Sequence, residues 1–446
     1  MNARKKKIVI WLVIVCLAAG IIGTTAYLLY SFLPRSMSID WDSIEQANNG
    51  VTLLSATDDK NQTGSPALVK ADASGNILSS EWKVLQFTDM HLTHELKTTN
   101  DTIAHFIDAL NHEKPDFVVL TGDIVTRLGG KVRLQQLSEI FERAGIYWAY
   151  VLGNHEGDSD PYTVSREETM RIVSEYEHCL VDVSVKKTKS GEDVWGNGNY
   201  VVNLLGEGNN IVQTMIFMDS GNKMSASDYE ALSESQPDMR KNYYDYLKES
   251  QMTWYEEQLQ AASALNANVK SMLFIHIPLV EYRNLLLVKL SEDGMATIPA
   301  GYEKIDGSEV IVGGKTVGFF VLKEGWSVIG DTRSFETPCS SDYNNGMYAR
   351  MCALRAHVNG VFCGHDHINN TILYEADESP IYLCYGNCSG IQGYNKTADG
   401  LSDGPKYDDR GYSVIKIHAD STFDFADVLF DTNYNRIARI VNGQPA

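Results

Sequence analysis

The chain is short of positive charge, and no internal repeat is apparent in it. Its 446 residues hold 38 Lys and Arg against 58 Asp and Glu. Five of the basic side chains and none of the acidic ones lie in the first 35 residues, so the remainder carries 33 basic and 58 acidic side chains, a net charge of −25. Because a strongly acidic surface repels phosphate backbones, nucleic acid is not expected as a partner.

Cysteine is scarce, and no two cysteines form a CxxC pair. A structural zinc ribbon, which needs such pairs, is therefore not indicated. Six of the seven cysteines follow the N-terminal apolar run, and these are Cys179, Cys339, Cys352, Cys363, Cys384 and Cys388. Disulfides among them are permitted in an oxidising compartment, but the sequence does not choose a pairing.

One long uncharged stretch stands at the N-terminus. The basic cluster Arg4 to Lys7 precedes a mostly apolar run from Ile8 to Leu33. At ~1.5 Å per residue this run is about 39 Å long, enough to cross a bilayer with some tilt. A cleaved signal peptide is the alternative, but its apolar part usually has only ~7–15 residues. We expect residues 1–35 to be a single-pass signal anchor with a cytoplasmic N-terminus, which places the rest of the chain outside the cytoplasm.

The chain beyond the anchor divides into two further parts. Residues 36–80 are rich in Ser, Asn, Asp and Gly and are expected to form a polar stalk or linker, with a short strand at Ala67 to Val69. From residue 81 to 446, apolar strands alternate with amphipathic helices, and antiparallel strand pairs are added. This pattern predicts one α/β domain of two packed sheets with helices outside and with ligands on the loops at strand ends.

Five short motifs follow one another along this domain, each after an apolar run. They are Asp89-Met90-His91, Gly122-Asp123, Gly153-Asn154-His155-Glu156, His276 within FIHIP, and Gly364-His365-Asp366-His367. Each motif is common by chance, but the ordered set is not. The glycines precede candidate ligands, where a bare backbone can turn sharply off a strand.

The residue types in these motifs suit divalent cations. Carboxylate, imidazole and amide oxygen groups are the ligands that hard to borderline cations take. Residues two apart in an extended segment face the same side, so Asp89 and His91 can bind one ion while Met90 packs away. Asp123 has two oxygens and could bridge two ions about 3.5–4 Å apart. The other candidate ligands are Asn154, His276, His365 and His367.

Such a pair of cations would hydrolyse a phosphate ester. Two cations lower the pKa of a shared water toward neutrality, so that hydroxide forms in place and attacks, and they neutralise the phosphate oxygens. His155, beside the cluster, could protonate or hydrogen-bond the leaving oxygen, with a carboxylate such as Glu156 orienting it. The sequence therefore predicts a two-metal phosphoesterase site.

The motif set resembles the calcineurin-like metallophosphoesterase superfamily from Trp82 to Phe430. Further stretches are similar to the branch related to purple acid phosphatases, which includes the yeast cell-cycle phosphatase and bacterial relatives. These stretches are FMDSG, FIHIPLVEY, FCGHDHINN, YGNCSGIQGY and GYSVI. The resemblance implies a four-layer α/β/β/α sandwich. It implies one metal held by Asp89, His91, Asp123 and His367, another by Asp123, Asn154, His276 and His365, and His155 as the acid or transition-state donor.

Two positions depart from the true purple acid phosphatases. Their first motif ends in Gly where this chain has His91, and their second has Tyr where this chain has Thr126. The tyrosinate that gives the purple colour and favours ferric iron is thus missing. A colourless site with two ions of manganese, ferrous iron or zinc is expected, and the sequence does not choose among these metals.

The outer loops and the other histidines are less informative. Asn284 to Thr332 is expected to form a hairpin or flap near the metals, or else a decorative insertion. Tyr385 to Tyr394 reads by itself as an ordinary tight turn, but the family resemblance implies that it lines the mouth of the site. The remaining histidines are expected at the surface or behind the ligands, with His94 the least secure of them.

The expected activity is hydrolysis of phosphomonoesters. A phosphodiesterase acting on nucleotides or lipid head groups is the first alternative, since both reactions use the same metals. A metal-binding but catalytically idle ectodomain is the second. A DNA nuclease is disfavoured by the export signal and the acidic body.

Overall fold

The computed structural model describes residues 11, 15, 20–23 and 36–446, apart from 73, 127–128, 159–162, 237–242, 313, 330–336, 394–409, 431–433 and 435. Within these residues no helix is long and apolar enough to cross a membrane. Most of the expected transmembrane run, Ile8 to Leu33, lies outside the described residues.

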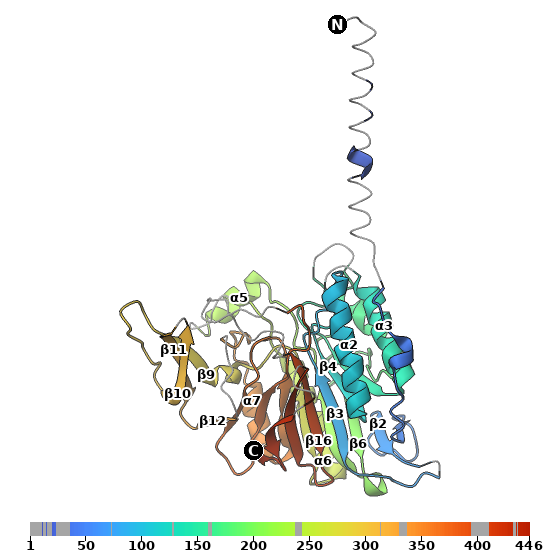
Figure 1. Cartoon of the computed structure of the whole chain (residues 1–446). Coiled ribbons are helices and arrows are strands. Elements are labelled where there is room, and N and C mark those ends of the chain that lie inside the picture. The colour runs from blue at the N-terminus through green and yellow to red at the C-terminus, as the bar shows by residue number, and fades with distance from the viewer. Residues whose placement is uncertain are drawn as a thin grey trace, which may run out of the picture.

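Two β-sheets pack face to face in the body (Figure 1). The seven-stranded sheet has the order β19-β18-β17-β16-β3-β4-β5, built from β3 (Trp82–Phe87), β4 (Phe117–Thr121), β5 (Tyr147–Val151), β16 (Gly411–Ile417), β17 (Phe423–Leu429), β18 (Arg436–Val441) and β19 (Gln444–Pro445). The nine-stranded sheet has the order β1-β2-β6-β7-β8-β13-β15-β14-β12, built from β1 (Val51–Leu54), β2 (Ala67–Lys70), β6 (Tyr200–Leu205), β7 (Ile211–Phe217), β8 (Lys270–Phe274), β12 (Trp326–Ile329), β13 (Val358–Cys363), β14 (Ile372–Glu375) and β15 (Tyr382–Tyr385).

Aromatic side chains fill the space between the two sheets. Phe117 of β4 lies edge-on to Phe217 of β7, with ring centroids 6.4 Å apart. Phe362 of β13 lies 6.0 Å from Phe425 of β17. The inner faces of both sheets therefore share one hydrophobic core.

Helices cover the outer faces. On the seven-stranded sheet, Phe106 of α2 (Leu96–Glu113) packs on Phe87, and Phe141 of α3 (Gly130–Ala144) stacks on Trp148. On the other sheet, Tyr255 of α6 (Glu249–Leu265) shares a hydrogen bond of 3.0 Å with Ser271 of β8. The other α-helices of the body among residues 36–446, within the part that the structure describes, are α4 (Arg166–Val173), α5 (Ala226–Ser233) and α7 (Met347–Ala353). The layers run helix, sheet, sheet, helix, as the sequence predicted.

The central strands of each sheet run parallel. β3, β4 and β5 are parallel neighbours, and so are β7, β8, β13 and β15. Since parallel strands end at the same edge of a sheet, the loops that follow them gather there. The mostly apolar run Trp82–Phe87 forms β3, which delivers Asp89 to this edge.

The segment 36–80 differs from the expected stalk. The predicted short strand is present as β2, but it pairs in parallel with β6 and so joins the nine-stranded sheet. Ala67 and Leu68 are fully buried, and Met37 is only 4% exposed. Short apolar stretches within a polar composition are enough to bind this segment to the body.

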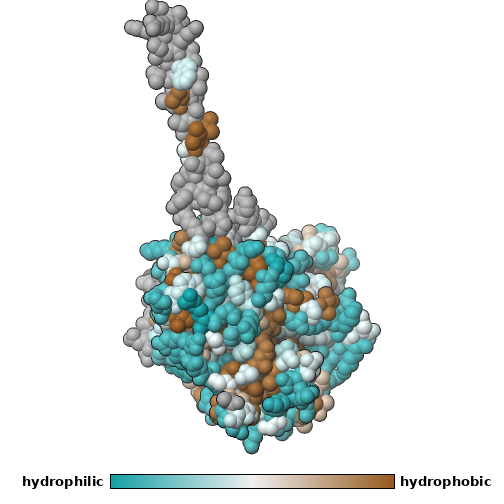
Figure 2. Space-filling view, turned by 90° about the vertical axis from the view of Figure 1, so that its right-hand side faces the viewer, coloured by the Kyte–Doolittle hydropathy of each residue, from teal (hydrophilic) through white to brown (hydrophobic). Residues whose placement is uncertain are grey.

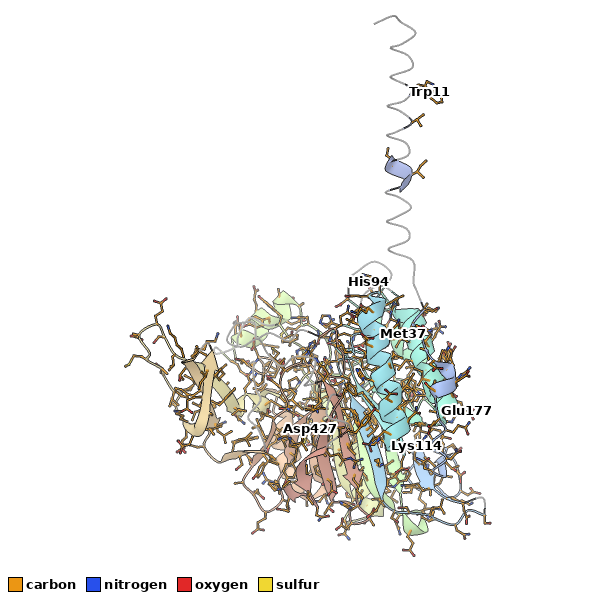
Figure 3. All side chains as sticks on the ribbon, in the orientation of Figure 1. Trp11, Met37, His94, Lys114, Glu177 and Asp427 are labelled. Carbon is orange, nitrogen blue, oxygen red and sulfur yellow. The ribbon has the colours of Figure 1, made fainter. Side chains whose placement is uncertain are left out.

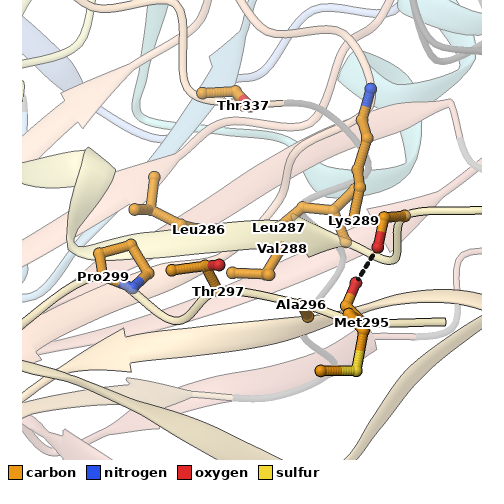
Figure 4. Close-up of a pocket in the computed structure, with 10 residues that line it drawn as sticks. Leu286, Leu287, Val288, Lys289, Met295, Ala296, Thr297, Pro299 and Thr337 are labelled. Carbon is orange, nitrogen blue, oxygen red and sulfur yellow. Dashed lines mark hydrogen bonds between the residues drawn. The ribbon is translucent and has the colours of Figure 1, made fainter. Parts of the chain in front are cut away.

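The predicted flap is a small sheet of its own. β9 (Leu285–Lys289), β10 (Tyr302–Val312) and β11 (Lys315–Lys323) form a three-stranded antiparallel sheet, at the left of Figure 1. β9 and the turn at 291–299 line a cavity of about 450 Å³, shown in Figure 4.

Candidate metal centre

The five motifs converge at the carboxyl ends of the parallel strands. Asp89 follows β3 by two residues, Asp123 follows β4 by two, and Asn154 follows β5 by three. From the other sheet, His276 follows β8 by two residues and His365 follows β13 by two. Parallel strand order thus brings together side chains that are far apart in the sequence.

Asp89, His91 and His367 form the first of two clusters. Each offers one ligand atom within 4.8 Å of the others, and all three side chains are buried. Oδ1 of Asp89 lies 3.5 Å from Nε2 of His367, and the Nε2 atoms of the two histidines are 2.8 Å apart. Three potential ligand atoms therefore point at one small volume.

Asp123, His276 and His365 form the second cluster, also within 4.8 Å. Oδ2 of Asp123 lies 3.2 Å from Nε2 of His276 and 3.9 Å from Nε2 of His91, so Asp123 stands between the clusters. Oδ1 of Asn154 lies 3.1 Å from the same His276 nitrogen. All seven predicted ligands are thus found in one place.

The residues present fit two divalent cations. Oδ1 of Asp89 and Nε2 of His365 are buried without a hydrogen-bond partner, which is rare and unfavourable unless another group satisfies them. His276 directs Nδ1 to the carbonyl of Thr121 at 2.8 Å, which leaves Nε2 for the cluster. Carboxylate, imidazole and amide donors suit manganese, ferrous iron or zinc alike.

The protonation states are also mostly those of ligands. Burial would raise the pKa of Asp89, but His367 and His276 beside it hold that pKa at about 2. Burial lowers the pKa of His91 to about 3, and burial with the charge of His276 lowers that of His365 to about 3. Anionic carboxylates and neutral imidazoles are the forms that bind metal.

Four of the predicted ligands have left-handed backbones. The φ angles are +52° at Asp89, +47° at His91, +53° at Asp123 and +82° at His365. Such conformations are uncommon outside glycine and cluster at functional sites, where the surroundings impose them. The turns after the strands therefore aim these side chains inward at some conformational cost.

The glycines serve two different needs. Gly122 has φ +87°, as expected of a sharp turn. Gly364 instead permits close approach, because a Cβ there would lie 1.9 Å from Oγ1 of Thr88 and 2.6 Å from Oδ2 of Asp89. Its absent side chain allows the loop after β13 to lie against the loop after β3.

His155 is oriented by Asp158, and the expectation for Glu156 was wrong. Nδ1 of His155 lies 2.9 Å from Oδ2 of Asp158, which leaves Nε2 for the cleft. Burial would lower the pKa of His155, but Asp158 and Asp123 raise it to about 9. Asp158 was missed because the sequence does not show which carboxylate after the motif turns back.

Glu156 is buried and joins two ligand loops instead. Its carboxylate accepts hydrogen bonds from the backbone N–H groups of Asp123, Ile124 and Gly153 at 2.9, 2.7 and 2.7 Å, and from the hydroxyl of Tyr150 at 2.7 Å. It therefore fixes the loop after β4 to the loop after β5.

A cleft of about 490 Å³ opens onto the first cluster. Its described lining consists of His91, Thr93, His94, Glu95, Thr126, His155, His367, Gln392 and Gly393. His94, expected at the surface or behind the ligands, is exposed and lines this cleft. Gln392 and Gly393 come from the loop expected at its mouth, while Tyr394 lies outside the described residues. No described residue of the predicted flap belongs to this lining.

Tyr244 is a second residue that sequence reasoning missed. Its ring stands edge-on to His365, with centroids 4.5 Å apart, and Nζ of Lys223 lies 3.8 Å from its centroid. Nothing in the local sequence signals this contact, because it depends on how the segment before α6 folds over the second cluster.

Comparison with known proteins identifies the class. Residues 83–296 match the family described as Calcineurin-like phosphoesterase. This stretch of the chain is therefore similar to calcineurin-like phosphoesterase domains, as the motifs indicated.

Relatives are similar over most of the chain. "Probable inactive purple acid phosphatase 29" of Arabidopsis thaliana is 25% identical, over 72% of this chain and 74% of the relative. "Phosphatase DCR2" of Saccharomyces cerevisiae is 27% identical, over 73% of this chain and 50% of the relative. A solved dimetal phosphatase from Danio rerio is 12% identical with a TM-score of 0.43, over 80% of this chain and 98% of that one.

Proposed function

We propose that the chain is a membrane-anchored phosphoesterase whose two-metal site lies outside the cytoplasm and hydrolyses phosphomonoesters. The observation that carries this proposal is the convergence of seven candidate ligands, from the ends of five strands, beside an oriented histidine. Bound there, two divalent cations supply the nucleophile and the positive charge that phosphoester hydrolysis needs.

The chain's own residues have distinct parts in this reaction. Asp123 lies between the two clusters, where its carboxylate would contact the cation of each. His155 lines the cleft with Nδ1 on Asp158, so its Nε2 is placed to hold a proton for the leaving oxygen. In the metal-free protein, the pKa of about 9 keeps His155 protonated near neutral pH.

The anchor is the second part of the proposal. It rests on the uncharged run Ile8 to Leu33 behind a basic cluster. Trp11, Ile21 and Ile22 are 72%, 67% and 67% exposed, and a bilayer would cover this apolar surface.

Two competing functions follow from the relatives and from the chemistry. The yeast relative is named a phosphatase, which supports the monoester reaction, but a diesterase would use the same metals. The Arabidopsis relative is named probable inactive, and by analogy an idle metal-binding ectodomain is the second competing function. Against an idle site, every predicted ligand and His155 are present here.

One experiment separates these functions. The full chain in detergent, loaded with manganese, is assayed on p-nitrophenyl phosphate and on bis-p-nitrophenyl phosphate beside an Asp123→Asn control. A faster rate on the first substrate supports the proposal. A faster rate on the second makes the protein a diesterase, and no rate above the control makes it an idle domain.

A further inference from the structure

We propose that the substrate is a phosphomonoester carried by a membrane lipid, because the body is held with its metal cleft at the membrane surface. This inference rests on the proposed activity and on the proposed anchor. It adds the substrate class, and it starts from where the described chain joins the body.

The body begins almost directly after the apolar run. Met37 is 4% exposed, and its N–H donates to Oε1 of Gln136 on α3 at 2.7 Å. The N–H of Ser38 donates to Oδ1 of Asn100 on α2 at 3.0 Å. Between Leu33 and Met37 there are four Cα steps, which span at most about 14 Å. No stalk separates the proposed anchor from the body.

The chain joins the body at the edge that carries the cleft. Asn100 lies five residues after Glu95, about 8 Å along α2 at ~1.5 Å per residue. Glu95 and His94 both line the cleft. In Figure 3, His94 and Met37 lie toward the upper end of α2, and Lys114 lies at its other end.

These lengths bound the height of the cleft above the bilayer. The sum of three lengths gives this bound: the connection from Leu33 to Met37, the contacts of Met37 and Ser38 with the body, and the rise along α2. The rim of the cleft therefore lies on the order of 30 Å or less from the hydrocarbon. Lipid headgroups occupy roughly the first 5–7 Å of that distance. A tether this short keeps the cleft within a few tens of ångströms of the layer in which a lipid phosphate moves, so the effective concentration of such a substrate is raised.

The surface and the chemistry are consistent with this substrate. The face shown in Figure 2 is largely hydrophilic, and residues beyond 35 carry a net charge of −25, so a mainly neutral membrane suits the body best. Hydrolysis breaks the bond between phosphorus and the lipid oxygen. The oxygen of water joins the phosphorus, and one proton of water passes to the lipid alcohol, so the products are inorganic phosphate and that alcohol.

The test lengthens the tether without touching the site. The full chain is reconstituted in phosphatidylcholine vesicles that contain some phosphatidic acid. A Gly/Ser spacer of about 30 residues, with an end-to-end distance of roughly 30 Å, is inserted between Arg35 and Ser36. A matched control carries the same spacer between Asp293 and Gly294, in an exposed turn of the flap. Rates are measured on the phosphatidic acid and on soluble p-nitrophenyl phosphate.

The spacer after Arg35 is expected to lower the rate on phosphatidic acid about threefold or more and to leave the soluble rate unchanged. The flap spacer is expected to change neither rate. An unchanged ratio of lipid to soluble rate in the first variant would overturn the inference, and so would no hydrolysis of phosphatidic acid by a chain that hydrolyses p-nitrophenyl phosphate. If the soluble substrate is not hydrolysed either, the proposed function itself fails, and if the chain does not float with vesicles, the anchor fails.

Discussion

At the scale of single residues, Asp123 is the side chain that both clusters share. Its Oδ2 lies 3.2 Å from Nε2 of His276 and 3.9 Å from Nε2 of His91, and burial leaves it no solvent. Asp123→Asn keeps the shape but removes the charge, so we expect it to lose bound manganese and activity together. Metal analysis and the p-nitrophenyl phosphate rate check this, with Asp108→Asn on the exposed face of α2 as control. Full activity in Asp123→Asn would refute a shared ligand.

Also at the residue scale, His155 and Asp158 are expected to act as one unit. His155→Ala should keep its metal and slow turnover by roughly 10²–10⁴-fold. Asp158→Asn should slow turnover less, and the double variant should be no slower than His155→Ala, because Asp158 acts only through the ring it orients at 2.9 Å. Losses should be larger for an alkyl phosphate than for p-nitrophenyl phosphate, whose leaving group needs less help. Additive losses would show that the two residues work independently.

At the scale of elements, Glu156 determines how the loops after β4 and β5 meet. It accepts from the N–H groups of Asp123, Ile124 and Gly153 and from Tyr150. Glu156→Gln points an amide NH₂ at these donors, so we expect a loss of about 2–4 kcal/mol in the free energy of unfolding and weaker metal binding. Urea unfolding and metal titration measure both. The exposed Glu139→Gln should change neither, and wild-type stability in Glu156→Gln would exclude the proposed joining role.

The elements also show how much of the fold and the site can be predicted from the sequence. Apolar runs predicted the central strands, and parallel order then brought the ligands together, so the site could be found without a structure. α2 begins at Leu96, in a mostly polar stretch where no apolar spacing marks the start of a helix. The sequence could not predict that Asp158, and not Glu156, orients His155. The backbone turns after Asn154 decide this, because they direct Glu156 inward to the N–H of Gly153 and Asp158 toward His155 at the cleft.

At the scale of the whole molecule, the histidines predict how stability changes with pH in the metal-free protein. His91 and His365 have folded pKa values of about 3, below the ordinary 6.5. As pH falls below 6.5, the unfolded chain binds protons that the folded chain cannot, so stability is lost on the acid side. Asp89, with a pKa of about 2 against 3.8, adds to that loss at lower pH. His276 and His155, with pKa values of about 9, contribute stability below 6.5 that is lost as pH rises to 9.

The melting temperature in chelator should therefore pass through a maximum near pH 6.5 and fall on both sides. Manganese should change the acid side and the alkaline side of this pH profile differently. A cation needs His276 without its proton, so binding replaces the proton that favours folding below pH 9 and should remove the part of the alkaline fall that comes from His276, leaving the part that comes from His155. On the acid side, protons compete with the cation for His91 and His365, so the metal-bound protein should lose its extra stability as pH drops. Melting curves recorded with chelator and with manganese between about pH 4 and pH 10 measure both the acid and the alkaline side of the profile. If the melting temperature changed with pH in the same way with manganese as with chelator, these histidines would not bind the cation.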